Sequence, residues 1–168
     1  LTRHLVERVE RLILVELDHE LVAELREEYG HRPGVRIVHG DVLEVELGEV
    51  VSDPSRLVVV GNIPYNITTP IIFKLLERPR PREIVLMVQK EVGERIAADP
   101  GTSEYGALAV GVRSVAGVER LFDVSRNAFR PVPPYFTQFH AISLRFAPNP
   151  PRFDAFASPW NRRATSGE

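Results

Sequence analysis

Short apolar runs alternate with longer amphipathic stretches along most of the chain. The apolar runs lie at 11–17, 35–42 (with its exit loop), 56–61 and 82–89. Runs of this length, bounded by polar, glycine or proline residues, are typical of strands that are covered on both faces. Most of them are followed by residues with helical spacing of apolar positions. Strands that alternate with helices in this way predict a doubly wound α/β sheet.

The first helix is expected to begin after Asp18, because an aspartate accepts hydrogen bonds from the free N–H groups of a helix start. It continues to about Tyr29 and ends at Gly30. Leu21, Val22 and Leu25 are expected on one face of this helix.

A second helix is expected with Thr69 as its cap and Pro70 at its first position, where proline is well tolerated. The later part of the chain adds two helices and an antiparallel pair of strands. The helices are expected at 90–99 and 103–116. The strands are expected at 118–125 and 139–146.

Composition narrows the class of protein. The chain has 168 residues, of which 43% are hydrophobic, enough for one domain with a substantial core. It has no cysteine, which excludes disulfides and thiolate metal sites. It has no apolar run of the roughly 18 residues that a membrane span needs, and no signal sequence, so we expect a cytoplasmic protein without a membrane or metal site.

A formal net charge of −2 does not by itself indicate a nucleic-acid-binding protein. Basic residues do cluster locally. The clusters are Arg78, Arg80 and Arg82, then Arg126 and Arg130, then Arg162 and Arg163. Each is read as solvated loop charge unless the clusters share a face.

Polar residues stand at the ends of the first, second and third predicted strands: Glu16, Asp41 and Asn62. In open α/β sheets, ligands bind beyond the carboxyl ends of the strands. Each residue also has an ordinary alternative, because an acid after a strand often caps a helix and Asp41 after Gly40 suits a turn. Together they predict a nucleoside-like ligand, although the chain has no G-x-G-x-x-G loop.

The third strand is followed by "NIPY", which offers unusual chemistry for a connecting loop. The Asn62 side-chain oxygen and the Pro64 carbonyl can accept hydrogen bonds from a planar exocyclic amine. The Tyr65 ring offers a stacking surface for a base. This combination suits an enzyme that aligns a purine amine with a methyl donor. The alternative is a polar turn before a helix, with Tyr65 only packing.

The motifs "GNIPYNITTPIIFKLL", "MVQKEVGERI", "YGALAV" and "NAFRPVPP" occur in this order along the chain. Together they resemble the ribosomal RNA adenine N6,N6-dimethyltransferases that modify small-subunit rRNA. The resemblance implies a Rossmann-like S-adenosylmethionine-dependent methyltransferase sheet and two methyl transfers to each adenosine N6. The "NIPY" motif alone also matches the macrolide-resistance methyltransferases of large-subunit rRNA.

Cofactor contacts follow from the resemblance by position. Glu16, with its neighbour Leu17, would hold the ribose hydroxyls of S-adenosylmethionine. Asp41, with its neighbour Val42, would hold its adenine amine. Asn62 would line the cofactor and would also accept a hydrogen bond from the N6 amine of the target adenosine.

Target contacts follow in the same way. Pro64 would offer its carbonyl to the adenine amine, and Tyr65 would stack on the base. Phe129 matches the second aromatic that clamps the base from its other side. Its alternative is a core phenylalanine before a proline turn. A base in such a clamp has to leave its stack.

The chain departs from the family at both ends and at one internal segment. Residues 1–147 correspond to the methyltransferase domain without its first strand and glycine-rich loop. Residues 148–168 are expected to be a linker and the start of a helical domain. The segment 135–140 makes the path after Phe129 longer than in the family. We expect the strands ending at Glu16 and Gly61 to pair or to remain exposed, and this polypeptide to bind S-adenosylmethionine poorly and to be inactive alone.

The resemblance implies small-subunit rRNA, within an immature small ribosomal subunit, as the partner of a monomeric enzyme. A non-catalytic nucleic-acid-binding relative of the same fold remains an alternative. So does a methyltransferase for a DNA adenine or a small amine.

Overall fold

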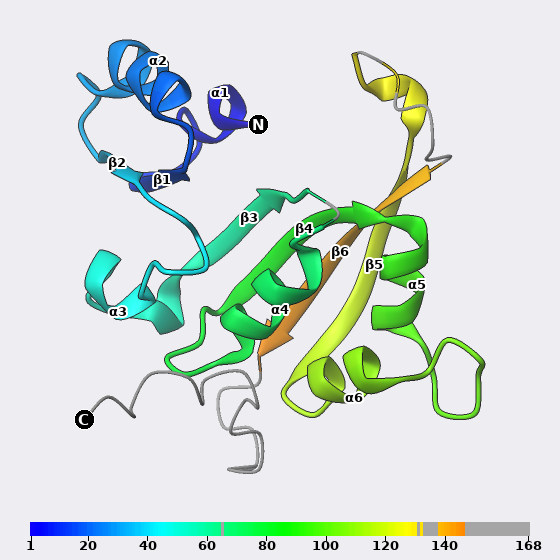
Figure 1. The fold of residues 1–168 in the computed structure, drawn as a ribbon. Coiled ribbons are helices and arrows are strands. Elements are labelled where there is room, and N and C mark those ends of the chain that lie inside the picture. Colours follow the sequence, from blue (N-terminus) through cyan, green and yellow to red (C-terminus); the bar gives the residue numbers. More distant parts are fainter. Residues whose placement is uncertain (65, 131, 133–137, 147–168) are drawn as a thin grey trace, which may run out of the picture. The chain divides into compact units, whose positions relative to one another are not determined.

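The computed structural model describes residues 1–64, 66–130, 132 and 138–146. It divides into two compact units, Leu1–Ile84 and Val85–Glu168. The division falls inside strand β4 (Glu83–Gln89). Each unit is considered separately below, and Figure 1 shows the elements with their labels.

The first unit begins with a parallel strand pair covered by a helix. Strand β1 (Leu12–Glu16) pairs with β2 (Val35–His39), in a register that places Glu16 beside His39. Helix α2 (His19–Tyr29) connects the two strands and packs on both. A strand, a helix and a parallel strand in this order form the βαβ unit that the sequence predicts.

Helix α2 begins and ends where the sequence predicts. The Asp18 carboxylate accepts hydrogen bonds from the N–H groups of the next turn, and Gly30 is the C-cap. Val22 is 2% exposed and shares the buried face with Tyr29, seven residues later. Of the three residues expected on one face, Val22 is buried and Leu25 is half-buried, but Leu21 is 45% exposed. The buried stripe is narrow, and Leu21 lies outside it.

The helix after β3 (Val58–Asn62) begins earlier than the sequence predicts. Helix α4 covers Thr68–Leu76, and its N-cap is Ile67, which makes no side-chain capping bond. The prediction of Thr69 as the cap is therefore wrong, and Pro70 is the third helical residue. Proline is tolerated there because the N–H groups of the first turn have no partner within the helix.

Strands β1 and β3 belong to different sheets, so their edges do not pair with each other. Every residue of β1 is only half-buried, and Val60 in β3 is 38% exposed. The sequence left two outcomes open for these strands, pairing with each other or remaining exposed. The structure shows the second. Apolar strand edges left in this state attract further strands.

Four further elements of the described residues are short. They are α1 (Thr2–Leu5), α3 (Leu47–Val50), and the 3-10 turns η1 (Pro54–Arg56) and η2 (Arg126–Ala128). In the part of the chain that the structure describes, every helix is too short or too polar to span a bilayer.

The second unit is built on an antiparallel strand pair, as the sequence predicts. Strand β5 (Ala116–Ser125) pairs with β6 (Gln138–Phe146), and β6 lies between β5 and β4. Residues 140–144 of β6 are all buried, because both faces of this strand are covered. Helices α5 (Lys90–Ala97) and α6 (Ala107–Arg113) contact each other and pack on these strands (Figure 1).

Helix α5 approaches β6 closely at one glycine. A Cβ atom added to Gly93 would lie 2.9 Å from Nδ1 and 3.0 Å from Cβ of His140. His140 is only 1% exposed, so its ring cannot swing away into solvent. Gly93 is therefore required by the close contact of the helix with the strand, and not by backbone conformation.

Replacing Gly93 by alanine should reduce the free energy of unfolding by about 1–3 kcal/mol, because the added methyl group overpacks the contact with His140. Equilibrium urea unfolding of the intact protein measures this loss. Gly117→Ala is the control, since its added Cβ would meet its nearest atom at an ordinary 3.9 Å.

In a His140→Ala background, Gly93→Ala should raise the free energy of unfolding instead of lowering it. Without the His140 ring the added methyl group meets no obstacle. Alanine at position 93 then stabilises the protein by about 1 kcal/mol, the difference in helix propensity between alanine and glycine. An unchanged loss in this background would show that the contact with His140 is not the cause.

Candidate functional site

The carboxyl ends of β1 and β2 bring two of the predicted acids to one edge. The Gly40 N–H donates to the Glu16 carbonyl at 3.0 Å. The His39 Nε2 atom lies in hydrogen-bond contact with the Leu17 carbonyl, also at 3.0 Å. These two bonds hold the chain leaving β1 against the chain leaving β2, so Glu16 and Leu17 lie beside the loop that carries Asp41.

The Glu16 carboxylate is fixed by the backbone that follows it. Its Oε1 atom accepts from the N–H groups of Leu17 at 2.8 Å and Asp18 at 3.0 Å. These two bonds use one oxygen, so the other keeps its capacity to accept from a ligand hydroxyl. The geometry therefore fits a residue that binds a diol at the end of a strand.

Asp41 has the turn role that the sequence analysis kept open. Its Oδ1 atom accepts from the Leu43 N–H at 2.9 Å, and its carbonyl accepts from the N–H of Glu44 at the same distance. Asp41 and Val42 are both half-buried. The second carboxylate oxygen of Asp41 is not used in this turn, so the turn and a ligand contact are compatible.

Asn62 and Pro64 lie at the exit of β3, and both are exposed. The Pro64 carbonyl already accepts two hydrogen bonds, from the Thr68 hydroxyl at 3.0 Å and from the Ile67 N–H at 3.3 Å. Both lone pairs of this oxygen are therefore engaged in the turn before α4. Tyr65, the fourth residue of "NIPY", lies outside the described residues.

Phe129 follows the turn η2 in the second unit and is half-buried. Its ring lies against that of Phe139, with 4.6 Å between ring centroids and 42° between ring planes. One side of Phe129 is thus covered by an aromatic neighbour, and the residue is not part of the fully buried core.

Gln89 is a polar residue that the sequence analysis missed. It is the last residue of β4, and its side-chain Nε2 atom is buried with no hydrogen-bond partner. Burial of an unpartnered amide is costly. The signal was present in the sequence, since Gln89 ends an apolar strand just as Glu16 and Asn62 do.

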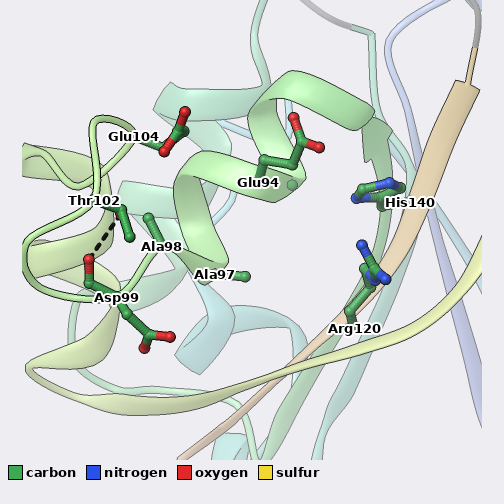
Figure 2. Close-up of a pocket in the computed structure, with 9 residues that line it drawn as sticks. Glu94, Ala97, Ala98, Asp99, Thr102, Glu104, Arg120 and His140 are labelled. Carbon is green, nitrogen blue, oxygen red and sulfur yellow. Dashed lines mark hydrogen bonds between the residues drawn. The ribbon is translucent and has the colours of Figure 1, made fainter.

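A pocket of about 430 Å³ lies in the second unit, and none of the predicted site residues lines it. Figure 2 shows Arg120 and His140, from the strands, facing the helix that carries Glu94. The Ser103 hydroxyl holds the pKa of Glu104, another lining residue, below its ordinary value. The acids at this pocket have partners within the protein, such as the Asp99–Arg113 ion pair at 2.9 Å.

No group of three or more histidine, aspartate or glutamate side chains that could hold a metal ion occurs in the described ranges. The candidate functional site is therefore the set of polar residues at the carboxyl ends of the strands, which includes Glu16, Asp41 and Asn62.

Solved structures with a similar fold define the class of protein. The chain resembles a dimethyladenosine transferase from Plasmodium falciparum with a TM-score of 0.74 and 29% identity, over 87% of this chain and 51% of that one. It resembles the 23S rRNA methyltransferase ErmE with a TM-score of 0.75 and 29% identity, over 89% of this chain and 57% of that one. The predicted fold class is confirmed: this is the α/β, Rossmann-like fold of S-adenosylmethionine-dependent methyltransferases.

The family is narrower than the class. The model of the ribosomal RNA adenine dimethylase family matches residues 1–135, and the chain belongs to this family. Two relatives are each 45% identical over 79% of this chain and 50% of their own length: the ribosomal RNA small subunit methyltransferases A of Chlorobium chlorochromatii and Geobacter metallireducens. The chain thus spans about half the length of these curated relatives.

Replacing Thr68 by valine removes the hydroxyl that binds the Pro64 carbonyl and keeps the shape of the side chain. Thr68 is buried, so we expect the free energy of unfolding to fall by about 0.5–1.5 kcal/mol, the usual net value of one hydrogen bond. Urea unfolding measures the change. Thr69→Val is the matched control, because Thr69 is the exposed neighbour in the same helical turn. Equal losses in both variants would contradict the role of the bond.

Proposed function

We propose that this chain is the methyltransferase part of an enzyme that dimethylates the N6 atoms of adenosines in small-subunit ribosomal RNA. The observation that carries the proposal is membership of the rRNA adenine dimethylase family, with relatives up to 45% identical that are named as small-subunit methyltransferases. Residues 1–147 form the methyltransferase domain in this proposal, and the segment 148–168 lies outside the described residues.

S-adenosylmethionine is the proposed cofactor, and it supplies an activated methyl group. The edge formed by β1 and β2 fits its nucleoside part. Glu16 and Leu17 would bind the ribose hydroxyls, and the free carboxylate oxygen of Glu16 supports this role. Asp41 and Val42 would bind the adenine, since Asp41 keeps an acceptor for the exocyclic amine.

Asn62 is proposed to position the target amine. The nitrogen lone pair of adenine N6 is delocalised into the ring, so it is a weak nucleophile. An amide oxygen that accepts from the N6–H favours a more pyramidal nitrogen and aligns it with the methyl group. The exposure of Asn62 at a strand end supports this role, because its oxygen can be reached by a substrate.

Pro64, Tyr65 and Phe129 complete the proposed target contacts. Pro64 would accept the second N6–H, and Tyr65 and Phe129 would stack on the base. The Pro64 carbonyl is not free to accept from the amine, because it already accepts hydrogen bonds from Thr68 and Ile67. To bind the amine, this carbonyl has to share or release one of these hydrogen bonds, and the rotatable Thr68 hydroxyl is the simpler one to move.

A second candidate is methylation of large-subunit rRNA, favoured by the similarity to ErmE at 29% identity. The curated relatives at 38–45% identity, all named for the small subunit, support the first candidate more strongly. The decisive test is to incubate the whole enzyme, of which this chain is the proposed methyltransferase part, with S-adenosylmethionine and either small subunits or large-subunit rRNA that lacks the modification. Dimethyladenosine in the small subunits alone, measured by mass spectrometry, is expected. Product only in large-subunit rRNA, or none in either, would overturn the proposal.

The immature small ribosomal subunit is the proposed partner, and the enzyme is proposed to act on it as a monomer in the cytoplasm. The relatives' names support rRNA as the substrate class.

Glu16→Gln should weaken binding of S-adenosylmethionine to the intact protein by about tenfold, because a neutral amide replaces a charge-assisted hydrogen bond to the ribose. Isothermal titration calorimetry measures the affinity. Asp18→Asn is the matched control: it removes a neighbouring negative charge while asparagine still caps α2. A similar loss of affinity in both variants would point to the general charge of this edge and not to Glu16.

Asn62→Ala should lower kcat for methylation by about 100-fold, the size of effect seen when one polar group that stabilises a transition state is removed. The KM for S-adenosylmethionine should change much less. Asn66→Ala, at an exposed position in the same loop, should retain the activity of the wild type. An active Asn62→Ala variant would remove Asn62 from the proposed mechanism.

A further inference from the structure

Phe129 is held from one side by an aromatic ring that comes from another strand. The ring centroids of Phe129 and Phe139 are 4.6 Å apart, and their planes are tilted by 42°. This separation lies in the range in which aromatic rings attract each other. Both residues are half-buried, so the pair sits at the surface of the second unit and is not enclosed in its core.

The register of β5 and β6 places Phe139 where this contact is possible. Phe139 pairs with Val124, and Gln138 pairs with Ser125 at the end of β5. The Ser125 hydroxyl then accepts from the Asn127 N–H at 3.3 Å and begins the turn η2. The chain leaves β5 and turns at once, so Phe129 returns to the start of β6.

The backbone around Phe129 is fixed on both sides. The Phe129 N–H donates to the Arg126 carbonyl at 3.1 Å. The Arg130 Nη1 atom donates to the carbonyls of Asn127 and Phe129, each at 2.9 Å. These bonds hold the main chain, which leaves the side-chain torsions of Phe129 as its remaining freedom. The contact with Phe139 limits those torsions.

We propose that Phe139 is a positioning residue, which holds the Phe129 ring in the orientation needed to stack on the target base. This inference rests on the proposed function for the role of Phe129. An aromatic clamp works best when its rings are already oriented, because ordering them during binding costs entropy.

The first part of the test measures the orientation of Phe129 without any activity. The intact protein is prepared with 4-fluorophenylalanine at position 129, and its fluorine NMR signal is recorded. Phe139→Leu should narrow this signal towards the linewidth of the unfolded protein, because the Phe129 ring gains freedom to reorient, whereas loss of the Phe139 ring current alone changes only the chemical shift. Phe146→Leu is the matched control, since Phe146 is at the opposite end of β6. An unchanged linewidth in Phe139→Leu, or equal narrowing in both variants, would overturn the proposal.

The second part measures methylation of small subunits. Aromatic pairs of this kind have interaction energies that correspond to factors of roughly two to ten. We expect kcat/KM for the RNA of the Phe139→Leu variant to fall by that factor, with the KM for S-adenosylmethionine unchanged. Phe139→Tyr should restore the wild-type value, whereas Phe146→Leu should not lower it. Full activity of Phe139→Leu, or an equal loss in Phe146→Leu, would overturn the proposal.

The two parts separate the possible failures. If the wild-type protein methylates nothing, the proposed function fails, and the fluorine signal still shows whether Phe139 orients Phe129. If methylation is present and the signal is insensitive to Phe139, the proposed function stands and the positioning role fails.

Discussion

The antiparallel pairing of β5 and β6 is the constraint on which the second unit depends. Its register places five consecutive residues of β6, His140 to Leu144, in a buried strand on which α5 packs, while α6 packs on β5. A strand that is covered on both faces has to be apolar or closely packed at every position. His140 meets this demand only because Gly93 leaves room for its ring. The same register ends β5 at the turn that returns Phe129 to Phe139.

In the first unit the corresponding constraint is the parallel pairing of β1 and β2. Because parallel strands end at the same edge, the residues after them meet there regardless of their distance in sequence. Glu16 and the loop carrying Asp41 are brought together by the main-chain bond from the Gly40 N–H and by the contact of the His39 side chain with the Leu17 carbonyl. Both carboxylates also stabilise their own loops, and each keeps one oxygen for a ligand. In the proposed function, each of these side chains thus serves both the fold and the cofactor site.

The Pro64 carbonyl is the point where fold and function compete. The turn before α4 uses both of its lone pairs, and the proposed chemistry needs one of them. Because Pro64 is exposed, solvent can replace one of these bonds when it is released, so sharing the carbonyl does not leave a buried acceptor without a partner. The Thr68 hydroxyl can rotate, whereas the Ile67 N–H is fixed by the backbone.

The sequence by itself determined the order of strands and helices, the Asp18 cap and the edge with Glu16 and Asp41, because these follow from local periodicity and from the rule that parallel strands end together. Tertiary structure decided the rest. The exposure of Leu21, the start of α4 at Thr68 and the Gly93–His140 contact depend on packing between distant segments. So do the unpartnered amide of Gln89 and the contact of Phe139 with Phe129. No local pattern encodes which atoms such segments bring within a few ångströms of each other.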